Sequence, residues 1–414
     1  MDLSGTMKSI LVAVLVAGLA CVTGRADAQE FTGLARIDPA ASHITDHGRH
    51  GAAIILTLSQ GVPYRVFTLD APHRLVLDFQ EVNWTGLDAD TLITSDSIVG
   101  ARFGTYVPGW SRMVLELAGP MALVRSDMQI DQEAGRAVLD LRLEPVGADT
   151  FAANAGAPSD PRWDLPEPEN LIVSPERAPD APLMVVLDPG HGGIDPGAQV
   201  GELIEKDLIL GFARELRELL LRQGGFEVLL TRDGDHFVSL ERRVALAHRA
   251  GADVFISLHA DSLSEGLAHG ATVHVLSEEA SDIATAKLAE RQDRADLLAG
   301  ADLSAADDEV TQVLLSLARQ ETRPRTAVLA ETLVDAMAQT GGPMNRRPLR
   351  AAAFSVLKAA DIPSVLIEVG FLSSPRDLKN LQDPEWRAGI ARGIVSGLTA
   401  WRQSDAALRE RRRK

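Results

Sequence analysis

Cysteine is nearly absent from this sequence of 414 residues, which has a single thiol at Cys21. One cysteine cannot form an intramolecular disulfide or a zinc site made of several thiolates. Cys21 lies inside an N-terminal segment that has the pattern of a cleaved leader, so we expect the mature chain to have no thiol. That expectation also excludes a cysteine nucleophile.

Basic residues are scarce relative to acidic ones, with 41 Lys and Arg against 58 Asp and Glu and a net charge of −17. Binding to nucleic acid or to anionic lipid requires clustered basic side chains, so neither is expected as a main partner. Apolar residues make up 45% of the chain, which is enough for real hydrophobic cores. The length predicts two or three domains.

The one long apolar run follows Lys8 and extends over Ile10–Val22. It is shorter than the about 20 residues that a membrane-spanning helix needs, so no membrane span is expected. A basic start, a short apolar core and the site Ala26-Asp27-Ala28 are together typical of a secretory signal peptide. We predict a signal peptide over 1–28 and a protein exported to the periplasm.

A proline-rich segment divides the rest of the chain. Seven of the 21 prolines lie between Pro158 and Pro182. Because proline favours extended backbone and lacks an amide donor, we predict a semi-rigid linker over 151–182. It separates a first domain over 30–150 from a second over 183–405.

The first domain has the pattern of half-buried β-strands, with apolar residues alternating along short runs such as Ile54–Leu58. A related six-residue pattern recurs at Arg74–Phe79, Arg112–Leu117 and Arg136–Leu141. Three copies predict an all-β sandwich built from related hairpins. Taken alone, such repeats are ordinary β packing and indicate no function.

The second domain alternates strands with helices, which predicts an α/β domain with a mainly parallel sheet. Strands are expected at Met184–Leu187, Phe226–Leu230, Val254–Leu258, Ala271–Leu276 and Val365–Ile367, and helices where Ile209, Phe212, Leu216 and Leu219 recur and near Leu240–Ala250.

Ligands in such sheets bind beyond the carboxyl ends of the strands. His191, His259 and Glu368 follow three of the predicted strands, so we expect them at one edge. Glu205 lies four residues before Ile209 and shares its sheet-facing side of the helix, so it can reach the same edge. Two neutral imidazoles and one carboxylate fit a three-ligand zinc site with an open position for water. We expect His191, Glu205 and His259 to bind zinc and Glu368 to transfer protons.

Each of these residues also has a simpler interpretation. A lone histidine at a strand end is usually a hydrogen-bonded polar residue. Glu205 alone would be a favourable charge at a helix N-terminus, and Glu368 alone a partner for a buried arginine. Their joint occurrence at strand ends favours the site.

Four motifs resemble the zinc-dependent N-acetylmuramoyl-L-alanine amidases of the amidase-3 type. The motifs are Leu187-Asp-Pro-Gly-His-Gly-Gly-Ile-Asp-Pro-Gly-Ala198, Glu205-Lys206, Ser257-Leu-His-Ala-Asp261 and Ile367-Glu-Val-Gly-Phe-Leu-Ser-Ser374. The resemblance implies that His191, Glu205 and His259 are the zinc ligands and that Glu368 is the catalytic glutamate. The implied reaction is hydrolysis of the amide between N-acetylmuramic acid and the L-alanine of peptidoglycan stem peptides. The first domain resembles the AMIN domain, which targets exported amidases to the cell wall, most clearly across Pro63–Phe79.

An insertion of helical pattern over about 280–340 separates the last two expected strands. Glu290 lies seven residues from both Ile283 and Leu297, so all three share nearly one helix face. Two interpretations are open: Glu290 occupies the open zinc position, or the helix is exposed and Glu290 is solvated. The segment Ala289–Gly300 resembles the inhibitory helix of cell-division amidases, which a LytM-domain activator displaces. The resemblance therefore implies an autoinhibited enzyme of septal wall splitting, and we expect it to act as a monomer.

Two rival functions are weighed against this hypothesis. The first is a zinc peptidase that cuts within the stem peptide, because the ligand set does not itself choose the amide. The second is a wall-binding regulator without activity, against which the presence of all four catalytic candidates argues.

Overall fold

The computed structural model describes residues 35–413 apart from 81, 108, 132–134, 159–180, 264–268, 299–308, 341 and 360, and for 294–298, 309–321 and 407–413 it describes the backbone only. The predicted signal peptide over 1–28 and most of the predicted linker lie outside the described residues. Within the described residues, no helix combines the length and apolarity that crossing a bilayer requires.

The first domain is mostly strands, as predicted. Its elements are β1 (Ala35–Arg36), β2 (His43–His47), β3 (Gly51–Leu58), β4 (Tyr64–Leu69), β5 (Arg74–Gln80), β6 (Val82–Asn83), α2 (Ala89–Leu92), β7 (Ile98–Val107), β8 (Trp110–Leu117), β9 (Met121–Ile130), β10 (Ala137–Pro145) and α3 (Ala148–Asn154). Helix α3 extends three residues past the predicted start of the linker.

Two four-stranded antiparallel sheets, β2-β3-β10-β9 and β4-β5-β8-β7, enclose the core of this domain. The three copies of the repeated pattern correspond to β5, β8 and β10, and each forms the second strand of a hairpin with the strand before it. Alternate residues face inward, as Leu75, Leu77 and Phe79 do on β5, and all three are fully buried. Period-two alternation therefore predicted the strands, but β5 is buried on both faces and not half-buried, since Val76 and Asp78 are buried as well.

The second domain is α/β. Its elements are β11 (Leu183–Pro189), β12 (Gln199–Val200), β13 (Leu203–Ile204), α4 (Glu205–Gln223), β14 (Phe226–Leu230), α5 (Leu240–Arg249), β15 (Val254–His259), β16 (Ala271–Leu276), α6 (Ile283–Leu298), α7 (Glu309–Thr340), β17 (Met344–Ala352), the 3-10 turn η1 (Ser355–Leu357), β18 (Ser364–Glu368), α8 (Pro375–Gln382) and α9 (Pro384–Arg413).

The six-stranded sheet of this domain has the order β14-β11-β15-β18-β16-β17. Strands β14, β11, β15 and β18 run parallel, β16 is antiparallel to β18, and β17 is parallel to β16. The sheet is thus mainly parallel, as predicted, with its last two strands reversed. The insertion forms α6 and α7, and the following β17 is an edge strand that the sequence did not predict.

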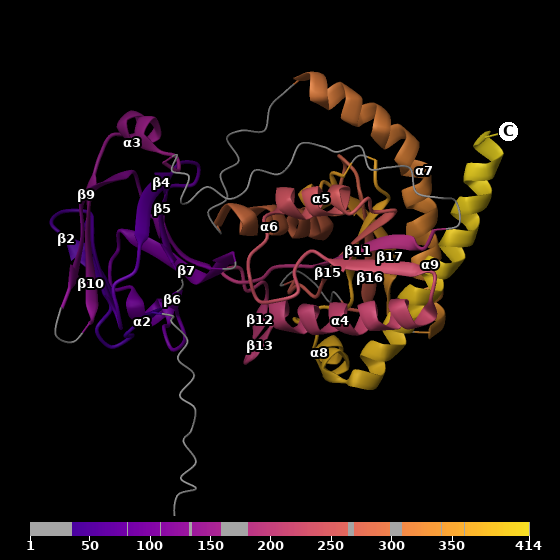
Figure 1. Cartoon of the computed structure of the whole chain (residues 1–414), viewed down its shortest axis with the longest axis horizontal. Helices are drawn as coiled ribbons and strands as arrows, with labels where there is room; N and C mark the ends of the chain where they lie inside the picture. The colour runs from indigo at the N-terminus through magenta and orange to yellow at the C-terminus, as the bar shows by residue number, and fades with distance from the viewer. Residues whose placement is uncertain are drawn as a thin grey trace, which may run out of the picture. The chain divides into compact units, whose positions relative to one another are not determined.

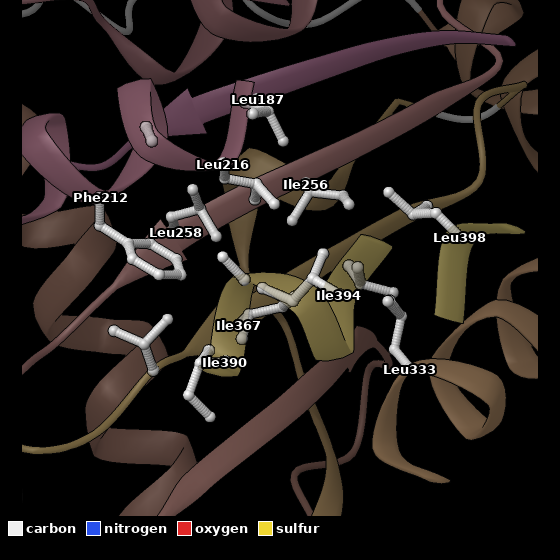
Figure 2. Packing of buried hydrophobic residues seen from close by; sticks show 14 of the residues in the cluster. Leu187, Phe212, Leu216, Ile256, Leu258, Leu333, Ile367, Ile390, Ile394 and Leu398 are labelled. Carbon is white, nitrogen blue, oxygen red and sulfur yellow. The ribbon is translucent and has the colours of Figure 1, made fainter. Parts of the chain in front are cut away.

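Helices cover both faces of this sheet (Figure 1). On one face, side chains of α4, α7 and α9 pack against alternate residues of β11, β15 and β18, and Figure 2 shows part of this cluster around Phe212, Ile256 and Ile367. On the other face, α5, α6 and η1 pack against Val186, Phe255 and Leu366. Burial on both faces explains why these strands are continuously apolar, and it leaves the carboxyl ends of β11, β15 and β18 at one edge.

Candidate metal and catalytic site

The four predicted site residues meet at this edge. His259 and Glu368 are the last residues of β15 and β18 and are direct partners in the sheet register. His191 lies two residues beyond the end of β11, and Glu205 is the first residue of α4. All four side chains are buried, with Glu205 and Glu368 fully inaccessible.

Two imidazole nitrogens and one carboxylate oxygen form a nearly equilateral triangle. His191 Nε2 lies 3.2 Å from Glu205 Oε1 and 3.2 Å from His259 Nδ1, and His259 Nδ1 lies 3.3 Å from Glu205 Oε1. Three ligands on a tetrahedral zinc ion, with bonds of about 2.0–2.1 Å, would be about 3.3 Å apart. The geometry of the three residues therefore fits a tetrahedral metal site with one position left open.

Neighbouring groups hold the three side chains in this orientation. His191 Nδ1 bonds to Asp195 Oδ2 at 2.7 Å, which leaves the Nε2 lone pair directed at the cluster. The amides of Ala198 and Ala260 each donate to one oxygen of Glu205 at 2.8 Å. A side chain at Gly190 would collide with the His259 ring, because a Cβ there would overlap its Cε1 and Nε2.

Two buried guanidinium groups fix the loop that carries His191. Arg243 donates to the carbonyl oxygens of Pro189 and His191 at 2.9 and 2.8 Å and forms a 2.6 Å ion pair with Asp188. Arg232 donates to the carbonyl oxygens of Pro189 and Gly190 at 2.9 and 2.8 Å. These bonds stabilise His191 in the left-handed region, at a φ of 61°, which costs energy for a residue other than glycine.

Glu368 lies beside the triangle, and only one of its two carboxylate oxygens accepts a hydrogen bond. Its Oε2 accepts a hydrogen bond from the Asp261 amide at 3.0 Å, whereas its buried Oε1 has no partner among the described residues. Burial, together with the charges of Asp261 and Glu205, raises the pKa of Glu368 well above its usual value. A carboxyl group with a raised pKa and a free oxygen is suited to accept and return a proton.

The site as a whole has an excess of negative charge. Burial and the Glu205 charge raise the pKa of Asp261 to about 6. Burial opposes charging of His191, but the carboxylates of Asp195 and Glu205 nevertheless raise its pKa well above the usual value. Such shifts indicate a buried anionic cluster that a cation would stabilise.

Helix α6 reaches the triangle through Gln292 and not through Glu290. Gln292 is buried, and its Nε2 lies 3.0 Å from His259 Nδ1. Glu290 is exposed, and Ile283 on the same face is 78% exposed. Residues two positions apart in a helix point about 200° apart around its axis. A helix that directs Gln292 inward therefore directs Glu290 outward. Glu290 therefore does not reach the three cluster atoms in this structure, which corrects the first interpretation and agrees with the second, in which Glu290 is exposed. Gln292 takes the inward position.

An α/β domain with a buried His, Glu and His cluster beside a carboxylate is typical of metal-dependent hydrolases. The family model described as N-acetylmuramoyl-L-alanine amidase matches residues 185–400, and the AMIN domain model matches residues 44–141. The chain belongs to the N-acetylmuramoyl-L-alanine amidase family.

Relatives with this activity in their names match most of the chain. It is 30% identical over 399 residues to the N-acetylmuramoyl-L-alanine amidase AmiC of Escherichia coli O6:H1, covering 91% of this chain and 90% of that one. It is 32% identical over 360 residues to AmiC of Neisseria meningitidis serogroup B, covering 83% and 85%. Among solved structures, AmiC2 of Nostoc punctiforme matches at 28% identity with a TM-score of 0.40, covering 54% of this chain and 99% of that one.

Proposed function

We propose that this protein is a zinc-dependent N-acetylmuramoyl-L-alanine amidase that hydrolyses the amide between N-acetylmuramic acid and the L-alanine of peptidoglycan stem peptides. The observation that carries the proposal is the triangle of His191 Nε2, Glu205 Oε1 and His259 Nδ1, with sides of 3.2–3.3 Å, next to the free oxygen of Glu368. Membership of the amidase family and the AmiC relatives support the choice of amide.

In this proposal His191, Glu205 and His259 hold the zinc ion. When bound, zinc polarises a carbonyl group and lowers the pKa of water from about 15.7 to about 7. Asp195 keeps His191 in the tautomer whose Nε2 faces the cluster. Glu368 Oε1 accepts a proton from the attacking water and gives it to the departing amine of L-alanine.

Helix α6 keeps the enzyme autoinhibited in this proposal, because Gln292 lies where a substrate would approach His259. A LytM-domain activator is the partner that would displace α6. The remaining functional proposals are export to the periplasm by the signal peptide over 1–28, wall targeting by the first domain over 30–150, a septal role in cell division, and action as a monomer.

The test is digestion of purified peptidoglycan followed by mass analysis of the soluble products. Full-length protein with zinc should release intact stem peptides that begin with L-alanine, slowly while α6 is in place and faster in Gln292→Ala, and a chelator should abolish their release. Glu368→Gln keeps the shape of the side chain but cannot take up the proton, so it should lose the activity. Glu279→Gln changes an exposed glutamate outside the site and should retain it.

The products also separate the rival functions. Fragments cut inside the stem peptide would make the protein a peptidase. A protein that releases nothing, even with α6 loosened by Gln292→Ala, yet sediments with peptidoglycan would be a wall-binding regulator.

A further inference from the structure

A cavity of about 540 Å³ lies on the α6 side of the sheet, next to the catalytic loops. Leu263 and Phe371, which follow the strands of His259 and Glu368, are among its lining residues, as are residues at the start of α6. Strand β17 contributes three cationic side chains, Arg346, Arg347 and Arg350. The cavity therefore combines closeness to the reaction site with a concentration of positive charge in a chain of net charge −17.

Two histidines of the lining have buried ring nitrogens without partners. His274 is 1% exposed and bonds through Nε2 to Thr272 Oγ1 at 2.8 Å, but its Nδ1 has no partner among the described residues. Nδ1 of His269 likewise has no hydrogen-bond partner among the described residues. A buried nitrogen without a hydrogen bond is costly, so the hydrogen bonding of this part of the cavity wall is incomplete.

One arginine of the cavity already holds a carboxylate. Arg350 Nη1 lies 2.8 Å from Asp282 Oδ2, and Arg350 Nη2 donates to Asn345 Oδ1 at 3.1 Å. Asp282 immediately precedes α6 and caps it, because its Oδ1 accepts a hydrogen bond from the Thr285 amide at 2.8 Å. The ion pair is partly exposed, with 17% of the Arg350 side chain and 30% of the Asp282 side chain accessible. Such a pair contributes little stability, and another carboxylate can replace Asp282.

We propose that this cavity is a subsite for a carboxylate of an acidic peptide substrate, and that Asp282 occupies Arg350 in place of that carboxylate. The inference rests on the proposed function, since a stem peptide that carries free carboxylates is the substrate that needs such a site. Helix α6 then imitates the substrate at both ends, with Gln292 at the ligand histidines and Asp282 at the subsite.

The spacing along α6 agrees with the length of such a peptide. Ten helical positions separate Asp282 from Gln292, which at about 1.5 Å per residue is about 15 Å. An extended peptide advances about 3.3–3.6 Å per residue, so four residues reach about 14 Å. The carboxylates near the end of a tetrapeptide stem can therefore reach Arg350 while its first residue is at the reaction site.

The test measures binding to the full-length, zinc-free protein by isothermal titration calorimetry at low ionic strength. The probes are the tetrapeptide L-Ala-γ-D-Glu-L-Lys-D-Ala and the same peptide with both carboxylates converted to carboxamides. Arg350→Gln should weaken binding of the acidic peptide by about tenfold, the loss typical of a charge-assisted hydrogen bond. Asp282→Asn keeps the helix cap but removes the competing charge, so it should tighten binding by about threefold.

Opposite effects of Arg350→Gln and Asp282→Asn on peptide binding distinguish a substrate subsite from an ion pair that only holds α6 in place. If Asp282 and Arg350 only fasten α6, both substitutions loosen the same helix and must shift binding in the same direction. Arg347→Ala, at an exposed position of the cavity, should weaken binding even if Arg350→Gln fails to fold. Arg249→Ala removes an exposed charge outside the cavity and is the matched control.

Shifts of equal sign, or equal binding of the acidic peptide and its carboxamide form, would overturn the subsite. Release of stem peptides from peptidoglycan, measured separately, distinguishes this failure from failure of the proposed function. If the protein is active but its binding does not depend on the carboxylates, only the subsite proposal is wrong. If the protein is inactive but the two substitutions shift peptide binding in opposite directions, the subsite proposal stands and the proposed amidase activity is wrong.

Discussion

The two halves of the site are held in place by different kinds of contact. The ligand half, consisting of the loop over 188–197 and the end of β15, is fixed by the buried Asp188–Arg243 ion pair and by guanidinium bonds to carbonyl oxygens. The covering half, α6, buries Leu288 and Ala289 against the sheet, and its other contacts are partly exposed and polar. Arg291, which pairs with Asp261 at 2.8 Å, is 43% exposed, and Asp293 contacts Ser355 at 2.9 Å.

This difference assigns different free energies to the two halves. Breaking a buried ion pair costs about 3–5 kcal/mol because it leaves a buried charge without a partner. A partly exposed pair is worth about 0–1 kcal/mol. The polar contacts of α6 therefore oppose its detachment less than the buried pair opposes opening of the ligand half. We expect α6 to detach first, so that access to the site can change while His191, Glu205 and His259 stay in place.

The largest effect should come from removing a ligand. His259→Ala should lower peptide release by about a thousandfold, since the several kcal/mol of catalysis by a metal ion are lost. The bound zinc, measured by elemental analysis, should fall with it. His248→Ala, on α5 and outside the site, is the control. If His259→Ala kept its full zinc content, His259 would not be a zinc ligand.

The next largest effect should be on stability. Arg243→Met keeps the length of the side chain but leaves Asp188 buried without its cation, so the free energy of unfolding of the zinc-free protein should fall by about 3–5 kcal/mol. Arg249→Met, at an exposed position of the same helix, should change it by less than about 0.5 kcal/mol. Urea denaturation measures both. A change of similar size in the two variants would mean that the buried pair does not fix this half.

A pH dependence follows from His274 on β16. Burial, together with the charge of Arg350, lowers the pKa of His274 to about 3. The folded state therefore keeps the ring neutral, whereas the unfolded state takes up a proton below about 6.5, so stability is lost as the pH falls from about 6.5 towards 3. Between pH 7.5 and 5.0, this group should account for about 2 kcal/mol of lost stability.

His274→Gln removes this contribution, so urea denaturation of the zinc-free variant should show a smaller loss between the two pH values than the parent protein does. Equal losses would mean that the ring is not kept neutral in the folded state.

The smallest effect should come from the covering half. Gln292→Ala removes one contact of α6 and should raise peptide release without an activator by about threefold to tenfold, equivalent to about 1 kcal/mol. Glu290→Ala, two positions away and exposed, should leave release unchanged. The reverse pattern would return the inhibitory role to Glu290.

The sequence contained enough information to predict which residues meet in the ligand half. His191, Glu205, His259 and Glu368 follow strands or begin a helix, and parallel strands place such residues at one edge. The roles of Asp195 and Arg243 were not predicted, because which buried side chain reaches which loop atom depends on tertiary packing. A partner for the second nitrogen of His191 is the signal that could have pointed to Asp195.

The covering half was harder to predict for two physical reasons. The face that α6 turns inward is set by its packing through Leu288 and Ala289, which are buried, and a helix with little amphipathic contrast does not reveal that face. Strand β17 contains three arginines and Pro348, a composition that an edge strand tolerates but that does not resemble a buried strand.

The most direct test of the difference between the halves is to lock α6 in place. Asp293→Cys with Ser355→Cys puts a cysteine pair where two contacting side chains now lie, and Cys21→Ser leaves no other thiol. With zinc present, the reduced protein should release stem peptides from peptidoglycan at least as fast as the parent, because it lacks the Asp293 contact. The oxidised protein should release none until a reductant is added. Equal release by the oxidised and reduced forms would contradict a detachable cover over a fixed site.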